Sequence, residues 1–310
     1  MTVAEDAARS RHAYRVAVVG AGAVGGYLAA QAHAAGHRVT LCARAPLPGL
    51  RLDEAGRSRM VPVAIAGDPT EDMETADWVL LTTKAQDTAG ADGWLRRLAG
   101  SQTVVAVLQN GLCHAERVAA AGVPCAVLPA LVYVAVERVA PGHVVHHDGR
   151  LLVVPAGETG ARFRDLWAGS AVEVRSTGDF HTAAWRKLLG NLAANPITAL
   201  TMRRIDVLRD PDVAALARRV LEEGLAVARA DGAQLGPEDI EAELRMYARV
   251  NPGGGSSMLY DRLAGRPLEH EYIIGEVVRR AERHGIPVPL NRALLTLLRA
   301  LAASVPPSSG

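Results

Sequence analysis

The sequence has few cysteines, almost no net charge and no long uninterrupted hydrophobic run. Cys42, Cys113 and Cys125 are the only cysteines among 310 residues and form no CxxC pair, which is typical of a reduced, intracellular protein rather than a disulfide scaffold. The 34 basic and 33 acidic residues give a net charge of +1. A global field that would attract nucleic acid or an anionic membrane is therefore absent, and we expect small-molecule partners.

The apolar stretches do not predict a leader or a membrane span. Glycines interrupt the stretch from Val16 to Ala30, and prolines at 124 and 129 interrupt the stretch from Val123 to Val136, which is also too short to cross a bilayer. We expect a cytoplasmic protein whose hydrophobic content of 49% supplies an ordinary core.

The first half of the chain alternates β-branched runs with alanine-rich stretches, which predicts a parallel, doubly wound sheet of the Rossmann type. The expected strands and helix are Arg15–Val19, Ala23–Ala35 (helix), Arg38–Ala43, Trp78–Thr82, Thr103–Leu108 and Cys125–Leu128. After Pro129, extended segments separated by glycine turns predict antiparallel strands added to the edge of this sheet. They are Leu131–Val139, His143–His147 and Leu151–Val154.

From His181 onward the pattern changes to amphipathic helices, including 213–230 and 268–284. We therefore predict an α/β protein with two domains, a Rossmann domain over residues 14–180 and an all-α domain over residues 181–304. The first dozen residues and the tail from Val305 lack apolar periodicity and are expected to be disordered ends.

A GxGxxG motif follows the first predicted strand and opens the first predicted helix. It reads Gly20-Ala-Gly22-Ala23-Val24-Gly25. In this context the glycines permit a tight turn and a close approach of the backbone to a pyrophosphate, which the helix N-terminus then stabilises. The motif predicts a dinucleotide cofactor.

The second strand ends without the acid that NAD-binding sites place there for the ribose hydroxyls. No aspartate or glutamate occurs between Gly26 and Leu52, and the strand is followed by Arg44, whose guanidinium suits a 2′-phosphate. NADPH is the better expectation, with a solvated arginine at the strand end as the alternative.

Two further strand ends point to the same edge of the sheet. Lys84 is placed to pair with phosphate or nicotinamide-side groups, and Asn110 to bond ribose or substrate. An ordinary Asn-Gly turn at Asn110 and Gly111 is the alternative.

In the second half, Lys187, Asn191 and Asn195 recur at intervals of four and share one helix face. One cation and two amides set among apolar residues are costly to bury without polar partners, which indicates a face that lines a ligand site. A solvated lysine face is the alternative. Pro196 is expected to end or kink this helix.

A second polar cluster follows the glycine run at residues 253–255. It contains Ser257 and Asp261 four residues apart and then Glu269. A serine at a helix start is also a common N-cap. The crowded histidines His143, His146 and His147 lack matching ligand spacing, so no metal site is expected.

These motifs resemble the ketopantoate reductase family from Arg15 to about Ala300. The resemblance is carried by VGAGAVGG, the Arg44 strand end, TTKAQDT, LQNG, WRKLLGNLAANPITAL, SSMLYDRLAGRPLEHEY and HGIPVPLN. The lysine–asparagine helix and the SSM block are its most specific parts. The chain departs from the family by about a dozen extra residues at its start and by Pro155, where many relatives have glycine.

The resemblance implies that Lys187 is a general acid toward the substrate carbonyl and that Glu269 is an acid needed for binding and turnover, at both substrate and cofactor. It assigns Arg44 to the 2′-phosphate. The implied substrate residues are Asn110, Asn191, Asn195, Ser257 and Asp261, of which the last can also serve to order its loop.

The implied activity is NADPH-dependent reduction of 2-dehydropantoate to D-pantoate for coenzyme A synthesis, by a monomer or homodimer. A paralogue that reduces another 2-oxo acid is the first alternative, because the motifs fix the reaction type better than the substrate. A non-catalytic NADPH-binding sensor is the second, but it would have little use for Lys187 and Glu269.

Overall fold

The computed structural model describes residues 13–70 and 72–303, which form two units. The sheet unit holds the described residues up to Gln109 together with His114–Ser176. The helical unit holds Asn110–Cys113 and the described residues from Thr177 onward, so one short loop of the first half groups with the helices. The two predicted disordered ends lie outside the described residues.

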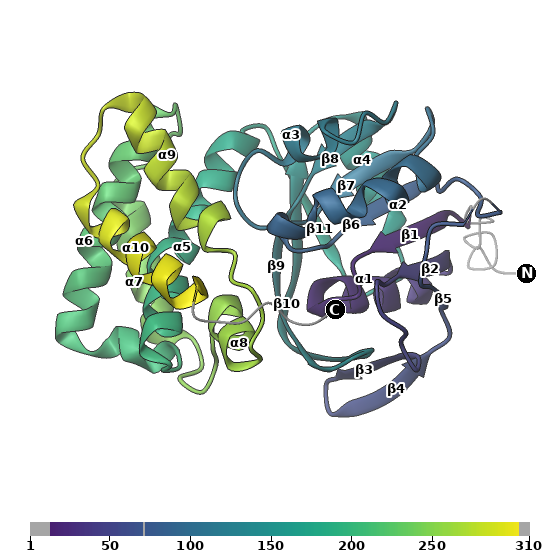
Figure 1. Cartoon of the computed structure of the whole chain (residues 1–310), viewed down its shortest axis with the longest axis horizontal. Coiled ribbons are helices and arrows are strands. Elements are labelled where there is room, and N and C mark those ends of the chain that lie inside the picture. Colours follow the sequence, from purple (N-terminus) through teal and green to yellow (C-terminus); the bar gives the residue numbers. More distant parts are fainter. Residues whose placement is uncertain (1–12, 71, 304–310) are drawn as a thin grey trace, which may run out of the picture. The chain divides into compact units, whose positions relative to one another are not determined.

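Six parallel strands form the first sheet, in the order β5-β2-β1-β6-β7-β8 (Figure 1). They are β1 (Arg15–Val19), β2 (Arg38–Cys42), β5 (Ala64–Ala66), β6 (Trp78–Leu81), β7 (Val104–Val107) and β8 (Ala126–Pro129). The chain moves outward from β1 in one direction and then in the other, as in a doubly wound sheet. The predicted Rossmann-type fold is confirmed.

Both faces of this sheet are covered, as the uninterrupted apolar runs of its strands require. Val18 packs in one core with Tyr27, and the next residue, Val19, packs in a second core with Trp94. The helices of the sheet unit are α1 (Ala23–Ala34), α2 (Asp92–Leu98), α3 (His114–Ala119) and α4 (Glu158–Leu166), with the short 3₁₀ turns η1 (Ala85–Asp87) and η2 (Ala89–Ala91).

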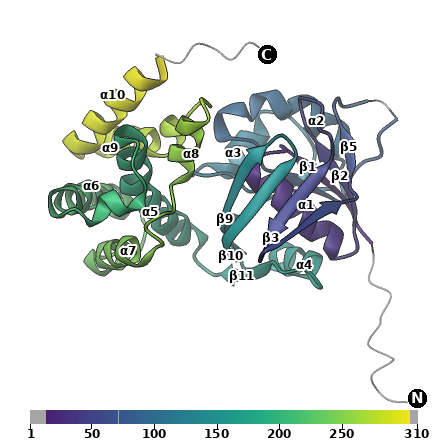
Figure 2. The same ribbon diagram turned by 90° about the horizontal axis from the view of Figure 1, so that it is seen from below.

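The extended segments after Pro129 do not join the edge of the first sheet, so that prediction is wrong. They form a second sheet in the order β11-β10-β3-β4, with β9 paired to β10 (Figure 2). Its strands are β3 (Leu50–Glu54), β4 (Arg57–Val61), β9 (Leu131–Ala140), β10 (His143–Pro155) and β11 (Glu173–Thr177). The physical reason is that β10 finds a parallel partner in β3, with His143 opposite Arg51, and an antiparallel partner in β9.

The predicted turn at residues 148 and 149 is a bulge within one long strand. The register of β10 against β9 shifts on both sides of Asp148. Gly149 has a φ of 72°, and a Cβ there would stand 2.5 Å from the carbonyl oxygen of Tyr133. Glycine therefore lets the strand continue where a turn was expected.

Helix α1 is mostly apolar around its circumference, with Gln31 as its one buried polar side chain, and packs against strands of both sheets. Its residues from Gly25 to Ala32 are all buried. It contacts β1 and β2 of the first sheet and β3, β9 and β10 of the second. A Cβ on Gly26 would stand 2.8 Å from Val144 Cγ2 of β10. A helix that is hydrophobic all round is a buried helix, and its position fixes the loop that precedes it.

The helical unit contains one long central helix, α5, and five further helices (Figure 1). They are α5 (Phe180–Thr201), α6 (Pro211–Ala230), α7 (Pro237–Arg249), α8 (Ser257–Leu263), α9 (Ile274–His284) and α10 (Pro289–Ala303), with the turns η3 (Ile205–Arg209) and η4 (His270–Tyr272). The helix predicted over 213–230 is confirmed as α6. The one predicted over 268–284 is too long, because η4 precedes α9 and the regular helix starts at Ile274.

Pro196 was predicted to end or kink its helix, and it lies inside α5, so it does not end the helix. The missing N–H of a proline removes one backbone hydrogen bond and costs about 3 kcal/mol. Residues on both sides of Pro196 are buried, and this burial offsets the cost. The helix ends only at Met202, whose φ of 58° is left-handed.

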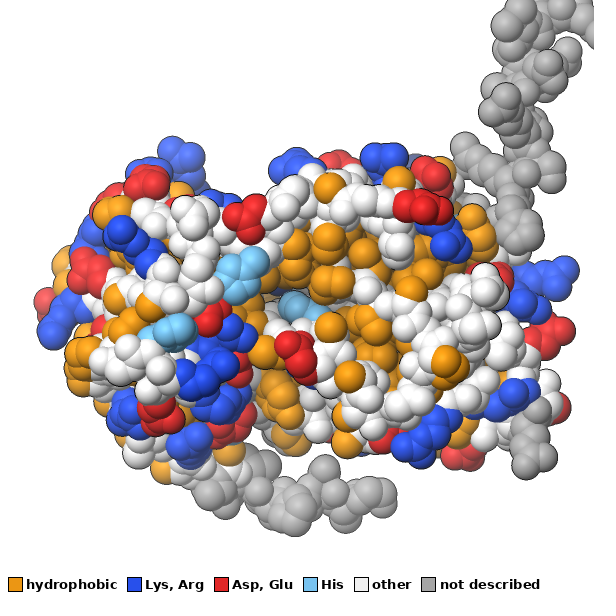
Figure 3. Space-filling model, turned by 90° about the horizontal axis from the view of Figure 1, so that it is seen from above, with side chains coloured by type: hydrophobic (Ala, Val, Ile, Leu, Met, Phe, Trp, Pro, Cys, Tyr) orange, Lys and Arg blue, Asp and Glu red, His pale blue; other side chains and the backbone are white. Residues whose placement is uncertain are grey.

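Charged residues of both signs are interspersed over the face of the helical unit shown in Figure 3, in keeping with the small net charge. Among the described residues, no helix combines the length and apolar character needed to cross a bilayer.

Candidate functional site

The loop between β1 and α1 has a shape that only glycine permits at two positions. Gly20 has a φ of 115°, and a Cβ on Gly25 would stand 1.9 Å from the carbonyl oxygen of Gly20. Around Gly22, by contrast, no described atom lies within 4 Å of the place a Cβ would take. The loop is therefore tightly packed at Gly20 and Gly25, whereas the space beside Gly22 is open.

The open side of the loop carries the first amide groups of α1. The helix begins at Ala23, and its N-cap, Gly22, has no side chain to occupy the amide groups at Ala23, Val24 and Gly25. Free amides and the helix dipole at an accessible N-terminus favour an anion. The predicted glycine-loop residues thus lie together and fit the pyrophosphate of a dinucleotide.

The end of β6 lies against this loop. Thr82 Oγ1 donates a hydrogen bond to the carbonyl oxygen of Gly20 at 2.8 Å. Lys84, two residues further on, is half-buried and opens η1. The structure therefore places the predicted Lys84 in the segment beside the glycine loop.

Arg44 follows β2, as predicted, with a side chain that is 75% exposed. Its Nη2 lies 3.3 Å from Oδ2 of Asp87 in η1. An acid therefore reaches the end of β2, although none occurs between Gly26 and Leu52. Asp87 belongs to the TTKAQDT motif, but no local pattern shows that its carboxylate reaches Arg44 from a different loop.

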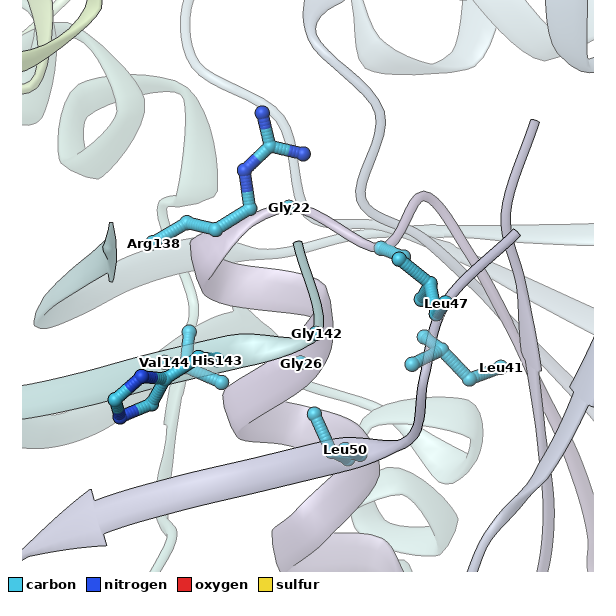
Figure 4. Close-up of a pocket in the computed structure, with 10 residues that line it drawn as sticks. Gly22, Gly26, Leu41, Leu47, Leu50, Arg138, Gly142, His143 and Val144 are labelled. Carbon is cyan, nitrogen blue, oxygen red and sulfur yellow. The ribbon is translucent and has the colours of Figure 1, made fainter. Parts of the chain in front are cut away.

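A second arginine reaches the glycine loop from β9. Figure 4 shows Arg138 extending over Gly22, and both line a small pocket together with Gly26 and Leu50. A guanidinium is permanently charged and binds phosphate oxygens in a fixed geometry. No motif pointed to Arg138, since it lies on a strand whose sheet was not predicted.

In the helical unit, α5 carries Lys187, Asn191 and Asn195 at successive turns. Lys187 and Asn191 are half-buried, whereas Asn195 is only 2% exposed. The Asn195 Nδ2 group is buried without a hydrogen-bond partner among the described residues. Buried polar atoms are nearly always bonded, so this amide can donate to a ligand or water.

The Lys187 ammonium group is attracted electrostatically by two carboxylates, Glu269 and Glu243. Burial lowers the pKa of Lys187 to about 8, and the attraction of Glu269 and Glu243 opposes this fall. The lysine is therefore protonated at neutral pH, yet gives up its proton far more readily than an ordinary lysine.

Glu269 links the loop that carries Asn110 to the polar residues around Lys187. Its side chain is buried, and its Oε2 accepts a hydrogen bond at 3.1 Å from Nδ2 of Asn110. The structure thus brings together Lys187, Glu269 and Asn110, which lie far apart in the sequence.

Ser257 and Asp261 are placed differently. Ser257 is exposed, and the N-cap of α8 is its neighbour Ser256, whose hydroxyl accepts from the backbone N–H of Leu259 at 3.1 Å. Asp261 is buried and forms an ion pair with Arg266 at 3.0 Å. This pairing supports the view that Asp261 orders its loop.

The loop that carries Asn110 is held by a partly buried polar contact that no motif predicts. Arg280 of α9 donates from Nη2 to Sγ of Cys113 at 3.0 Å and from Nε to Glu276 Oε1 at 2.7 Å. No local pattern marks Cys113 or Arg280 as partners, because the contact joins residues 113 and 280.

The three crowded histidines have separate partners. His143 Nε2 lies 2.8 Å from Asp53 Oδ2, and the rings of His146 and Tyr27 stack with centroids 4.7 Å apart. Within the described part of the chain, no group of three or more His, Cys, Asp or Glu side chains is arranged to hold a metal.

A glycine loop at the carboxyl end of the central strand, fitted to a diphosphate, is how NAD(P)-dependent oxidoreductases of this fold hold their cofactor, and this protein is of that class. The sequence profile described as "Ketopantoate reductase PanE/ApbA" matches residues 16–158, and that of "Ketopantoate reductase PanE/ApbA C terminal" matches residues 179–302. The chain belongs to the ketopantoate reductase family.

Individual relatives agree with this assignment. A 2-dehydropantoate 2-reductase of Mycobacterium tuberculosis is 40% identical, over 92% of this chain and 97% of the relative. One from Caulobacter vibrioides is 36% identical, over 93% and 99%. The solved PanE/ApbA family ketopantoate reductase of Ralstonia eutropha has a TM-score of 0.84 at 36% identity and covers 93% of this chain and 98% of that chain.

Proposed function

We propose that this protein is an NADPH-dependent reductase that converts 2-dehydropantoate to D-pantoate, with Lys187 as the general acid. The observation that carries the proposal is the polar group on α5, in which the half-buried Lys187 shares a helix face with Asn191 and the buried Asn195 and lies within the electrostatic reach of Glu269. The names of the relatives support the choice of substrate.

Reduction of a 2-oxo acid creates negative charge on the carbonyl oxygen of C2. Bound NADPH supplies the hydride. The Lys187 ammonium stabilises the developing oxyanion and donates the proton that completes the hydroxyl group. Glu269 keeps Lys187 charged until that moment and holds Asn110 by a hydrogen bond.

The neutral polar groups of the site suit an anionic substrate. Asn191 and Asn195 lie one and two turns beyond Lys187 on α5, and their amides can donate to the substrate without adding a competing charge. The buried, unsatisfied Nδ2 of Asn195 is the donor with the strongest requirement for a partner. Ser257 is proposed as a further donor.

The preference for NADPH rests on Arg44, because only NADPH carries a 2′-phosphate. Arg44 is proposed to bind the 2′-phosphate, and Arg138 to bind a phosphate beside Gly22. The Asp87 carboxylate 3.3 Å from Arg44 makes this preference weaker than it would be with an unpaired arginine.

The test is oxidation of NADPH by purified protein with 2-dehydropantoate, run beside pyruvate, 2-oxoisovalerate and benzoylformate. Fast turnover confined to 2-dehydropantoate and lost in Lys187→Ala is the expected result. Turnover with another 2-oxo acid alone would assign the protein to a paralogous activity, and tight NADPH binding without any turnover would identify a sensor.

Oligomeric state is a separate question. A solved Staphylococcus aureus relative, 27% identical, is described as a dimeric ketopantoate reductase. Either a monomer or a homodimer is proposed for this chain, and light scattering on the purified protein distinguishes them.

A further inference from the structure

Helix α7 turns a stripe of three polar side chains toward α5, at intervals of four residues. Asp239 accepts from Arg186 Nε at 2.8 Å, and Tyr247 Oη donates to the carbonyl oxygen of Gly190 at 2.8 Å. Glu243 lies between them, and α5 and α7 are packed together along this stripe.

The carboxyl group of Glu243 lies directly against the backbone of α5. A Cβ on Gly190 would stand 2.9 Å from Glu243 Oε2 and 3.3 Å from its Oε1. Glycine is unfavourable inside a helix, but here it leaves the room that the carboxyl group occupies. Gly190 is three residues after Lys187, so the carboxyl group and the lysine belong to the same side of α5.

The other two members of the stripe have defined structural partners, whereas Glu243 does not. Among the described residues, no hydrogen bond to the Glu243 carboxyl group occurs, and its electrostatic partners are Arg186, Lys187 and Asp239. Burial, assisted by Asp239, raises the pKa of Glu243 to about 7. Glu243 in turn raises the pKa of Lys187.

We propose that Glu243 is a positioning residue that acts through Lys187 and helps to hold the lysine in its ammonium form. This inference rests on the proposed role of Lys187 as the proton donor. Above neutral pH the Glu243 carboxylate is ionised. In the same pH range Lys187 approaches the midpoint of its own titration, so the negative charge of Glu243, added to that of Glu269, then stabilises the ammonium form. Glu269 and Glu243 thus act on the lysine from two different chain segments.

Three charged groups on the other elements around α7 have partners other than Glu243. On α6, Arg218 is bidentate to Glu241, and on η3, Asp206 pairs with Arg203. The remaining charged group of η3, Arg209, donates to a backbone carbonyl oxygen. The titratable groups that interact electrostatically with Glu243 are Arg186 and Lys187 on α5, and Asp239 and Tyr247 on its own helix.

The sequence allows a direct measurement, because Lys84 and Lys187 are its only two lysines. Protein grown with lysine labelled with ¹³C at Cε should give two side-chain resonances, assigned with Lys84→Arg. The chemical shift of each, followed against pH without cofactor or substrate, reports the ionisation of that amine. Lys84 serves as a reference in the same tube.

In the unsubstituted protein we expect a midpoint near 8 for Lys187. Glu243→Gln should lower that midpoint by about one pH unit, the low end of the effect of a nearby opposite charge, and leave Lys84 unchanged. Glu241→Gln removes a carboxylate from the same helix and should leave Lys187 unchanged. An unaltered Lys187 midpoint in Glu243→Gln, or an equal shift in Glu241→Gln, would overturn the proposal.

A second variant guards against a folding defect in the first. Gly190→Ala places a methyl group where the Glu243 carboxyl group lies and should shift the Lys187 midpoint in the same direction. In turnover assays, the alkaline limb of kcat/KM should move down with the midpoint in both variants. Because the resonance measurement needs no turnover, its failure would refute this inference alone, whereas an inactive protein with the expected shifts would refute only the proposed reaction.

Discussion

Replacement of Lys187 by methionine should lower the turnover strongly and stabilise the protein. The pKa of Lys187 falls from 10.5 to about 8 on folding because of burial, and this fall is already net of the attraction of Glu269 and Glu243. It corresponds to about 3 kcal/mol. Because part of the side chain keeps contact with solvent, we expect about 2 kcal/mol from removal of the charge.

The size of this stabilisation depends on pH in a way that identifies its cause. Below pH 8 the lysine is charged in the folded and unfolded states, so the penalty is fully present. Between pH 8 and 10.5 the unfolded chain binds more protons than the folded one, and the stability of the unsubstituted protein rises. The advantage of Lys187→Met should therefore be largest at neutral pH and shrink toward pH 10.

The assay is urea denaturation at pH 7 and near pH 10, beside NADPH oxidation at pH 7. Turnover should fall by about 10²- to 10⁴-fold. Arg186→Met is the matched control, since its guanidinium is 47% exposed and stays charged throughout this range. A Lys187→Met protein that is less stable than the unsubstituted protein at pH 7, or a stability difference that does not change with pH, would refute the reasoning.

Three further predictions concern the proposed cofactor site. Arg44→Ala should weaken NADPH binding about tenfold and leave NADH binding unchanged, whereas Arg138→Ala should weaken the binding of both. Fluorescence titration of the nicotinamide measures each affinity. The same pattern of losses in the two variants would contradict these roles. Asp87→Asn should strengthen NADPH binding relative to NADH because it removes the carboxylate paired with Arg44, and an unchanged ratio would count against it. Gly22→Ala should lose dinucleotide binding but keep its Tm, whereas Gly25→Ala should lose binding and also have a lower Tm. The reason is that only the methyl group at position 25 would meet backbone, 1.9 Å from its Cβ position. Equal Tm values for the two variants would contradict this reasoning.

The sequence predicts those parts of the fold whose signals are local. The glycine loop is recognisable because strand, turn and helix follow one another closely along the chain. The polar face formed by Lys187, Asn191 and Asn195 is recognisable because helical spacing places every fourth residue on one side of a helix. The family of the chain, predicted from such motifs, is confirmed.

The second sheet was missed because its central pairing joins β3 to β10, almost a hundred residues apart, and no local pattern encodes such a partner. The helix continues past Pro196, where it was expected to end or kink, because the local cost of the proline is outweighed by burial on both sides. Glu243 is one of three glutamates on α7, and nothing in its neighbours shows that it alone turns toward Gly190.

The burial of α1 between two sheets has a consequence for the cofactor. Ordering a loop when a ligand arrives consumes part of the interaction free energy. Here, strands on opposite sides already immobilise the helix that presents the amide groups at Ala23 and Val24, so the anion site is preorganised. Amide hydrogen exchange in this helix should be slow even without nucleotide, and little of the binding free energy should be spent on folding the loop.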